Sequence, residues 1–350
     1  MTHLWVRAEC RENEERVGLM PDGVAQLLAQ GIHVTVEESG SRVIPDSDYA
    51  DVGAEISSEG SWVDAPDDAI IFGLKELPDN DLALRHRHIM FGHAYKGQPA
   101  GQRLLARFKA DGGSLYDLEY LEDENGRRVA AFGYWAGYAG AAVSLLAYAA
   151  QQTGVDCPAV DTWPSSAAMR EDVKTALSGA TPTALVIGAL GRVGTGATDL
   201  CEELGLSVTK WDMAETANGG PFPEVLDHDL FFNCILARPG TPVFVPSTAC
   251  DAARALRVIG DIACDPDSDF SPIKVYDHVT SWDTPVTRVC DAPPLDVMAI
   301  DNLPSLMPRE SSEDFAAQLL PHLMTLPEIG KGVWGRAKTY FDDHIEKVTT

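Results

Sequence analysis

The sequence lacks the usual features of membrane, secreted and nucleic-acid-binding proteins. No apolar run reaches 18 residues, so no membrane span is expected. Lys and Arg number 27 against 53 Asp and Glu, for a net charge of −26. Nucleic acid is therefore a poor partner, since binding it requires a basic face. The first residues, MTHLWVRAECRENEER, have no apolar signal-peptide core, and we expect a cytoplasmic protein.

Paired cysteine and histidine motifs are also missing. The seven cysteines are scattered and form no C-x-x-C motif. This pattern argues against a disulfide framework and a structural zinc site, and predicts reduced, mostly buried thiols. No H-x-x-x-H motif or carboxylate–histidine cluster with ligand spacing occurs, so no metal is expected.

What the sequence does contain is an alternation of strand-like and helix-like segments. Short apolar runs such as 68–77 and 88–95 end in polar residues, as buried parallel strands do. A second series begins at 184, after a small-residue-rich apolar stretch (133–152) that predicts a long buried helix. A further helix is expected after an N-cap at Ser311 or Ser312.

The predicted fold is α/β, with two Rossmann-like domains of parallel sheets separated by an active-site cleft. We assign residues 1–132 and about 320–350 to a substrate-binding, catalytic domain and residues 133–319 to an NAD-binding domain.

The stretch ALVIGALGRVGTGATDL (184–200) predicts a nucleotide site. Gly188, Gly191 and Gly194 follow an apolar strand and open a helix, whose N-terminal amides suit a pyrophosphate. Asp212 comes about 24 residues later, after the next strand, where an acidic residue binds the adenosine ribose. A carboxylate there favours NAD over NADP. The glycines alone also allow a tight turn without a ligand.

Cationic side chains lie at expected strand ends in the first domain. Lys75 ends IIFGLK and His93 ends IMFGH. A lysine near other cations has a depressed pKa and can act as a base. Arginines such as Arg16 and Arg128 suit a substrate with several carboxylates. Each residue also has a structural alternative, because a strand-end histidine or a solvated lysine needs no catalytic role.

Several longer blocks resemble one enzyme family. GLKELP, FGHAYKGQ, LYDLEYLEDENGRRVAAFGYWAGYAGAA, GALGRVGTGATDL, KWDMAET and IDNLPSLMPRE are similar to the NAD-dependent, L-lysine-forming saccharopine dehydrogenases. RAECRENEERVGLMPDGV also resembles the N-terminus that this family shares with alanine dehydrogenase. The similarity extends from residue 6 to about 340. It implies NAD-dependent, reversible oxidative deamination of saccharopine to L-lysine and 2-oxoglutarate.

The resemblance also implies the site residues. Lys75 would take the amine proton during hydride transfer, and His93 would manage proton transfers during imine hydrolysis. Glu76 and Glu119 would tune the charge of this cluster. The implied substrate-binding residues are Arg16, Lys75, Lys96, Gln98, Arg128 and Phe132. The implied cofactor-binding residues are Arg127, Gly188, Gly191, Arg192, Gly194, Asp212, Thr216, Leu236, Ile262, Ile300, Asp301, Asn302 and Leu303.

Two features differ from some relatives, and alternatives stay open. Val193 stands where some relatives have cysteine, so Cys234 is expected to lack a disulfide partner. A related amino-acid or opine dehydrogenase with another amine or keto acid is the main alternative function. A non-catalytic nucleotide sensor is a third, which Lys75 and His93 argue against. The family resemblance implies a monomer.

Overall fold

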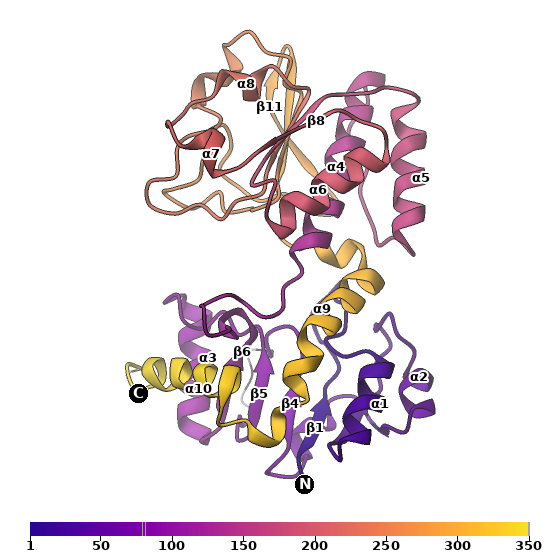
Figure 1. Ribbon diagram of the computed structural model, residues 1–350, viewed down its shortest axis with the longest axis vertical. Helices are drawn as coiled ribbons and strands as arrows, with labels where there is room; N and C mark the ends of the chain where they lie inside the picture. The colour runs from indigo at the N-terminus through magenta and orange to yellow at the C-terminus, as the bar shows by residue number, and fades with distance from the viewer. Residues whose placement is uncertain (79, 81, 349–350) are drawn as a thin grey trace. The chain divides into compact units, whose positions relative to one another are not determined.

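The computed structural model describes residues 1–348 except Asp79 and Asp81. The chain forms two compact units, and one of them is discontinuous in sequence (Figure 1). Unit 1 contains Met1–Ala131 and Ser311–Thr350, and unit 2 contains Phe132–Glu310. The chain thus re-enters unit 1 at Ser311, earlier than the expected residue 320, because the helix that returns it begins at Pro308.

Unit 1 is built on a six-stranded sheet of parallel neighbours in the order β3-β2-β1-β4-β5-β6. In such a doubly wound sheet, ligands bind beyond the carboxyl ends of the strands, near the point where the strand order reverses. Here that point lies between β1 and β4. The strands are β1 (His3–Val6), β2 (His33–Glu37), β3 (Glu55–Ser57), β4 (Ile70–Phe72), β5 (Arg87–Met90) and β6 (Ser114–Asp117).

Helices cover the sheet of unit 1. Buried leucines of α3 and Phe341 of α10 pack in one core cluster with one residue from each of β1, β4, β5 and β6, namely Trp5, Ile71, Met90 and Leu115. Figure 1 shows α1 and α2 on the β1 side of unit 1, with α3 and α10 on the β6 side. The helical segments are α1 (Pro21–Ala29), α2 (Asp46–Asp51), η1 (Ser61–Asp64), α3 (Pro99–Asp111), η2 (Leu118–Tyr120), α9 (Pro308–Leu323), η5 (Leu326–Glu328) and α10 (Gly332–Ile345).

Unit 2 has a six-stranded sheet in the order β11-β12-β10-β9-β7-β8, in which only the β11–β12 pair is antiparallel. The order reverses beside β7, which pairs with both β8 and β9. Its strands are β7 (Ala184–Ile187), β8 (Val208–Trp211), β9 (Leu230–Asn233), β10 (Val258–Asp261), β11 (Val286–Asp291) and β12 (Pro294–Met298).

The long apolar helix predicted for 133–152 is α4 (Gly133–Thr153), and it packs tightly on α6 (Arg192–Glu203). A Cβ on Gly137 would lie 1.8 Å from Val193 O, and one on Gly196 would lie 1.9 Å from Tyr134 O. Glycine at both positions therefore lets the two backbones touch. The other helical segments of unit 2 are α5 (Ser166–Leu177), α7 (Met213–Thr216), α8 (Pro223–Leu226), η3 (Ser247–Cys250) and η4 (Leu303–Leu306).

Two local expectations are wrong. Cys250 and Cys290 form a disulfide, although their separation of 40 residues gave no sign of it. The fold brings η3 and β11 together, with the two Cα atoms 5.7 Å apart. The other five cysteines, Cys234 included, are free.

The second wrong expectation concerns α9, which begins at Pro308, so neither Ser311 nor Ser312 is its N-cap. Proline suits the first helical position because its φ is already helical. Both serines are buried instead, and Ser312 Oγ accepts a hydrogen bond from Val17 N.

Candidate active site

The backbone of Lys75 is fixed by two residues that follow β1. Glu9 accepts hydrogen bonds from Leu74 N at 2.6 Å and Lys75 N at 3.0 Å. The guanidinium of Arg7 donates to the carbonyl of Lys75 and forms an ion pair with Glu9. Lys75 lies just beyond the end of β4. The segment that follows the neighbouring strand β1 therefore fixes the backbone from which the Lys75 side chain extends.

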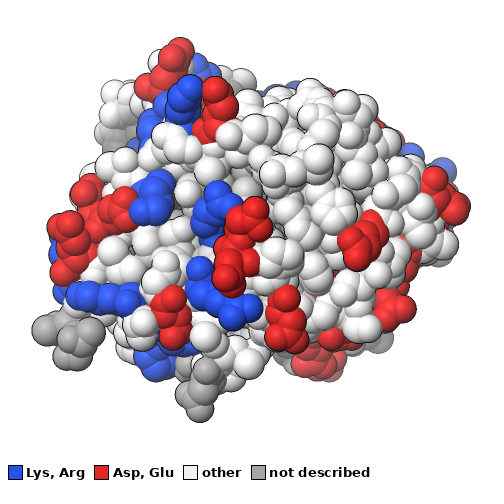
Figure 2. All heavy atoms as spheres, turned by 90° about the horizontal axis from the view of Figure 1, so that it is seen from below, with Lys and Arg blue, Asp and Glu red and all other residues white. Residues whose placement is uncertain are grey.

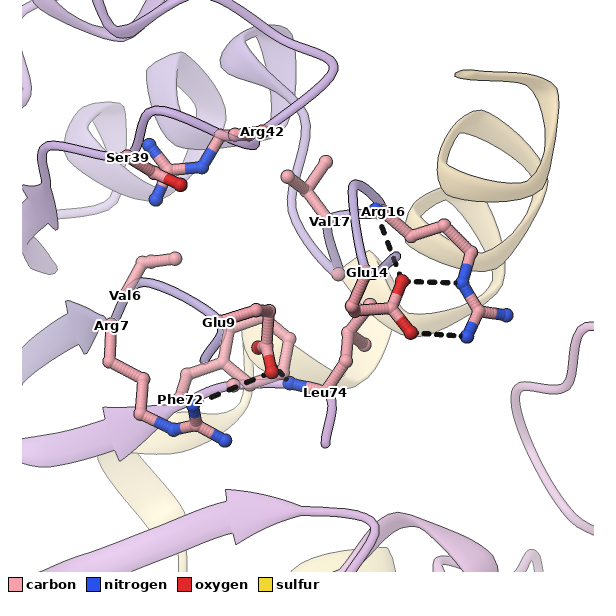
Figure 3. A pocket seen from close by; sticks show the side chains of 12 residues that line it. Val6, Arg7, Glu9, Glu14, Arg16, Val17, Ser39, Arg42, Phe72 and Leu74 are labelled. Carbon is pink, nitrogen blue, oxygen red and sulfur yellow. Dashed lines mark hydrogen bonds and ion pairs between the residues drawn. The ribbon is translucent and has the colours of Figure 1, made fainter. Parts of the chain in front are cut away.

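A buried ion pair adds to the charge around Lys75. Glu14 and Arg16 form a two-toothed pair, with the Nε and Nη2 atoms of Arg16 at 2.7 and 2.6 Å from the carboxylate (Figure 3). Both side chains are almost fully buried. Burial disfavours the charged form of Glu14, but Arg16 and then Lys75 outweigh it and lower its pKa. Arg16, for which the sequence predicts a substrate contact, thus also forms a buried ion pair with Glu14.

The pKa of Lys75 lies below its ordinary value. Burial is the largest cause and Arg16 the next, with Glu14 acting in the opposite direction. A buried ammonium beside a guanidinium loses its proton more easily than one in water. A larger share of Lys75 is therefore in the neutral form that can accept a proton than for an ordinary exposed lysine.

His93 follows β5 at the same edge of the sheet and has a φ of +48°, in the left-handed region. Non-glycine residues seldom adopt this conformation, which the surrounding structure must hold in place. Its Nδ1 lies 3.4 Å from Glu119 Oε2. This contact raises the pKa of His93, although burial acts against it.

Glu119, which follows β6, is the centre of a cationic cluster. Lys96 Nζ lies 3.0 Å from its carboxylate and Arg128 Nη2 lies 3.7 Å from it. The contact with His93, then Lys96 and Arg128, lower the pKa of Glu119 to about 2 against the effect of burial. The sequence-predicted residues Lys96, Arg128, His93 and Glu119 thus form one cluster.

The remaining predicted residues of this group lie in different settings. Glu76 forms an ion pair with Arg11 at 3.6 Å. Gln98 is the exposed residue before the first turn of α3. Arg127 is exposed in the loop after η2, in unit 1, although it was predicted to contact the cofactor. Phe132 begins unit 2 as the residue before α4.

In unit 2, the three glycines of the 184–200 stretch have different roles. Gly188 has a φ of +89°, and a Cβ on Gly194 would lie 2.1 Å from Gly188 O, so these two permit the turn and its packing. A Cβ on Gly191 would approach only Gly188 O, at 3.4 Å. Gly191 therefore leaves the N-terminus of α6 open, where first-turn N–H groups have no partner within the helix.

Asp212 directly follows β8 and lies beside this turn. Its carboxylate accepts hydrogen bonds from Leu190 N at 3.1 Å and Met213 N at 2.9 Å, and it caps α7. Leu190 and Met213 are 83% and 82% exposed, and Leu236, beyond β9, is 67% exposed. Three large apolar side chains thus stand in solvent around one helix N-terminus, an arrangement suited to binding a partly apolar anion such as a dinucleotide.

The other predicted cofactor residues of unit 2 lie at the same edge of the sheet, because each follows the carboxyl end of a strand or the turn beyond it. They are Arg192, at the start of α6; Thr216, in α7; Ile262, after β10; and Ile300, Asp301, Asn302 and Leu303, after β12.

Sequence reasoning missed two buried carboxyl groups of unit 1. Glu14 is the partner of Arg16, two residues earlier in ENEER. Asp117 ends β6, is 1% exposed, and accepts a hydrogen bond from Glu119 N at 2.9 Å. Burial raises the pKa of Asp117 to about 6. An acidic residue that ends a buried strand, as in SLYD, is the signal that could have identified it.

Among the described residues, no group of three or more His, Cys, Asp or Glu side chains could hold a metal ion. None of the described helices has the length and apolarity needed to cross a bilayer. On the face drawn in Figure 2, basic side chains lie among acidic ones and form no continuous basic surface.

Comparisons with known proteins identify relatives along the whole chain. The sequence model of one family, "Alanine dehydrogenase/PNT, N-terminal domain", matches residues 5–139. A Yarrowia lipolytica protein named "Saccharopine dehydrogenase [NAD(+), L-lysine-forming]" is 45% identical over 361 residues, covering 99% of this chain and 98% of its own. Proteins of the same name from Schizosaccharomyces pombe and Neurospora crassa are 43% and 44% identical, covering 99% and 98% of this chain and 99% and 96% of theirs.

Solved structures of two more distant proteins have a similar fold. An L-alanine dehydrogenase superposes with a TM-score of 0.69 at 19% identity, covering 99% of this chain and 94% of its own. A transhydrogenase from Sinorhizobium meliloti gives a TM-score of 0.62 at 18% identity, covering 94% and 96%. At these identities the likeness is one of fold.

Proposed function

Since the chain belongs to the family of NAD(+)-dependent, L-lysine-forming saccharopine dehydrogenases, we propose that it oxidises saccharopine reversibly to L-lysine and 2-oxoglutarate. Unit 1 binds the substrate and provides the acid–base groups, and unit 2 binds NAD. The observation that supports this best is the pairing of a lysine of lowered pKa with a histidine of raised pKa at one edge of the unit 1 sheet.

Lys75 is the base of the first step. In its neutral form it takes the proton from the secondary amine of saccharopine. Bound NAD would accept the hydride from the carbon next to this nitrogen. The C=N bond of an imine then forms within the substrate. Burial and Arg16 lower the pKa of Lys75 and favour its neutral amine, whereas Glu14 acts in the opposite direction.

His93 is the acid–base group of the hydrolysis. As water adds to the imine carbon, the imidazole accepts one water proton and passes it to the imine nitrogen, which gives a carbinolamine. The imidazole then takes the proton of the carbinolamine hydroxyl and donates it to the departing lysine nitrogen, so that the C–N bond breaks and the C=O bond of 2-oxoglutarate forms. Glu119 holds the imidazolium that exists between these two transfers. Lys96 and Arg128 provide positive charge for the substrate carboxylates.

The residues of unit 2 fit NAD. The open N-terminus of α6 suits the pyrophosphate, and Asp212 suits the adenosine ribose and disfavours a 2′-phosphate. Exposed Leu190, Met213 and Leu236 offer apolar contacts to the rings.

A coupled assay tests the reaction. The purified protein should oxidise NADH only when L-lysine and 2-oxoglutarate are both present. Replacing lysine with other amines, or 2-oxoglutarate with pyruvate or glyoxylate, should remove most of the rate. Strong preference for one of those replacements would instead support the related amino-acid or opine dehydrogenase.

A double variant tests the residue roles. Lys75→Met with His93→Gln should abolish turnover and leave NAD binding intact, as measured by fluorescence titration. Lys331→Met is the control, because that lysine forms only an exposed ion pair with Glu328. Near-normal turnover of the double variant would refute the assignment.

The proposed monomeric assembly rests on the family resemblance alone. We propose a monomer that acts in the cytoplasm. Light scattering on the purified protein should give the mass of one chain if the protein is a monomer. Cell fractionation would test the cytoplasmic location.

A further inference from the structure

Unit 1 contains a cavity of about 810 Å³ whose lining includes His93. Several other lining residues have no role in the reaction steps proposed for Lys75 and His93. Its walls come from the segments after β1, β4 and β5 and from the first turns of α3. A volume of this size is typical of small-molecule sites. The cavity lies at the carboxyl edge of the sheet, where the acid–base residues also lie.

The walls combine an apolar lining with opposite charges. Leu77, Pro78 and Leu104 provide apolar surface. Arg103 of α3 and the Arg11–Glu76 ion pair provide charge. The Arg11 and Glu76 side chains are 38% and 45% exposed, with 3.6 Å between their charged atoms, so a ligand can reach both.

The first turn of α3 also lines the cavity. Pro99 is the first residue of the helix, and the next two residues line the cavity as well. The backbone N–H groups of these next two residues have no acceptor within the helix. This end of the helix therefore favours a carboxylate. Arg107, one turn after Arg103, donates to the carbonyls of Pro78 and Leu82 and therefore helps to build the wall.

We propose that this cavity is the subsite for the amino-acid end of the lysine arm of the substrate, an inference that rests on the proposed function. The four methylenes of that arm lie along the apolar wall. Its α-carboxylate binds Arg103 and Arg11, and its α-ammonium binds Glu76. The reacting nitrogen is then at the His93 end.

The charges of the cavity favour the lysine arm over 2-oxoglutarate. The α-amino acid end of lysine is zwitterionic. Its carboxylate complements a guanidinium group and its ammonium complements a carboxylate. The keto acid has no cationic group for Glu76, which would repel it. It also has only two methylenes, so it would leave much of the apolar wall uncovered.

Steady-state kinetics of Arg103→Gln test the proposal. The KM for lysine should rise about ten-fold or more, the loss expected for a charge-assisted hydrogen bond. The KM for 2-oxoglutarate and the kcat at saturating lysine should remain within about two-fold. Arg85→Gln is the matched control, because Arg85 precedes β5 at the opposite edge of the sheet and its ion pair with Asp67 is exposed.

Two lysine analogues give an independent readout. 1,5-Diaminopentane lacks the α-carboxylate, and 6-aminohexanoate lacks the α-ammonium. The wild type should discriminate strongly against both. Arg103→Gln should lose discrimination against the first only, and Glu76→Gln against the second only.

Two kinetic results would overturn the subsite. One is a rise in the KM for 2-oxoglutarate with the lysine KM unchanged, and the other is unaltered kinetics in Arg103→Gln. If the wild type did not use lysine with 2-oxoglutarate at all, the proposed function itself would fail, so the two failures are distinguishable.

Discussion

Replacing Glu119 by Gln should move the pH dependence of the reaction. The carboxylate raises the pKa of His93 through the 3.4 Å contact with Nδ1. Glutamine keeps the size and removes the charge. It also leaves Lys96 and Arg128 without their shared anion, and both cations then oppose protonation of the imidazole. All of these effects have the same sign and lower the pKa of His93.

The size of the effect follows from the geometry. At 3.4 Å, two unit charges attract by about 1.2 kcal/mol in a water-like medium and by about 4.9 kcal/mol at an effective dielectric constant of 20. The His93 side chain is half exposed, which places the pair near the lower limit. We therefore expect a loss of about 1 to 2 kcal/mol, or a five- to thirty-fold weaker proton affinity.

The assay is the pH dependence of kcat/KM for saccharopine, which reports groups of the free enzyme. The limb that belongs to His93 should move by about one pH unit toward acid in Glu119→Gln. Glu124→Gln removes the same charge at an exposed position and should leave the profile in place. An unmoved limb in Glu119→Gln, or an equal shift in the control, would refute the reasoning.

Three further predictions concern unit 2. Asp212→Ala should weaken NAD binding about ten-fold or more and should reduce the preference for NAD over NADP. Titration with each cofactor would measure both dissociation constants. Gly137→Ala should destabilise unit 2 by about 1 to 3 kcal/mol, because its Cβ would meet Val193 O at 1.8 Å. Gly133→Ala, whose nearest neighbour would be at 3.2 Å, should change the urea midpoint far less. Replacing Cys250 and Cys290 by serine should remove about 4 kcal/mol according to the chain-entropy model for a 40-residue loop, and an unchanged melting temperature would contradict this.

The alternation of apolar runs was sufficient to predict the fold. Buried parallel strands such as β4 and β7 consist of apolar residues followed directly by a glycine, and both patterns are local. The antiparallel strand β11 was not expected, because none of its residues is fully buried and its sequence, VTRVCD, contains no apolar run. The Cys250–Cys290 disulfide depends on contacts between η3 and β11, so no local pattern could reveal it.

The site could be predicted in part for a similar reason. Lys75 and His93 stand at strand ends, and parallel strands bring their carboxyl ends to one edge. The sequence could not show that Arg16 is held by Glu14, or that His93 takes a positive φ. The Glu14–Arg16 pair is local in sequence, but its burial depends on tertiary packing, as does the positive φ of His93. The role proposed for Arg103 had no signal in the sequence, because most arginines of proteins are exposed and bind no ligand.

The discontinuity of unit 1 has a consequence for synthesis of the protein. A ribosome completes residues 132–310 before it adds 311–350. Trp334 and Phe341 of α10, which cover the β6 side of the sheet, are therefore absent while the whole of unit 2 is translated. Unit 2 can therefore fold on the ribosome before unit 1 is complete. Part of the core of unit 1 stays exposed to water and to chaperones until the last helix emerges.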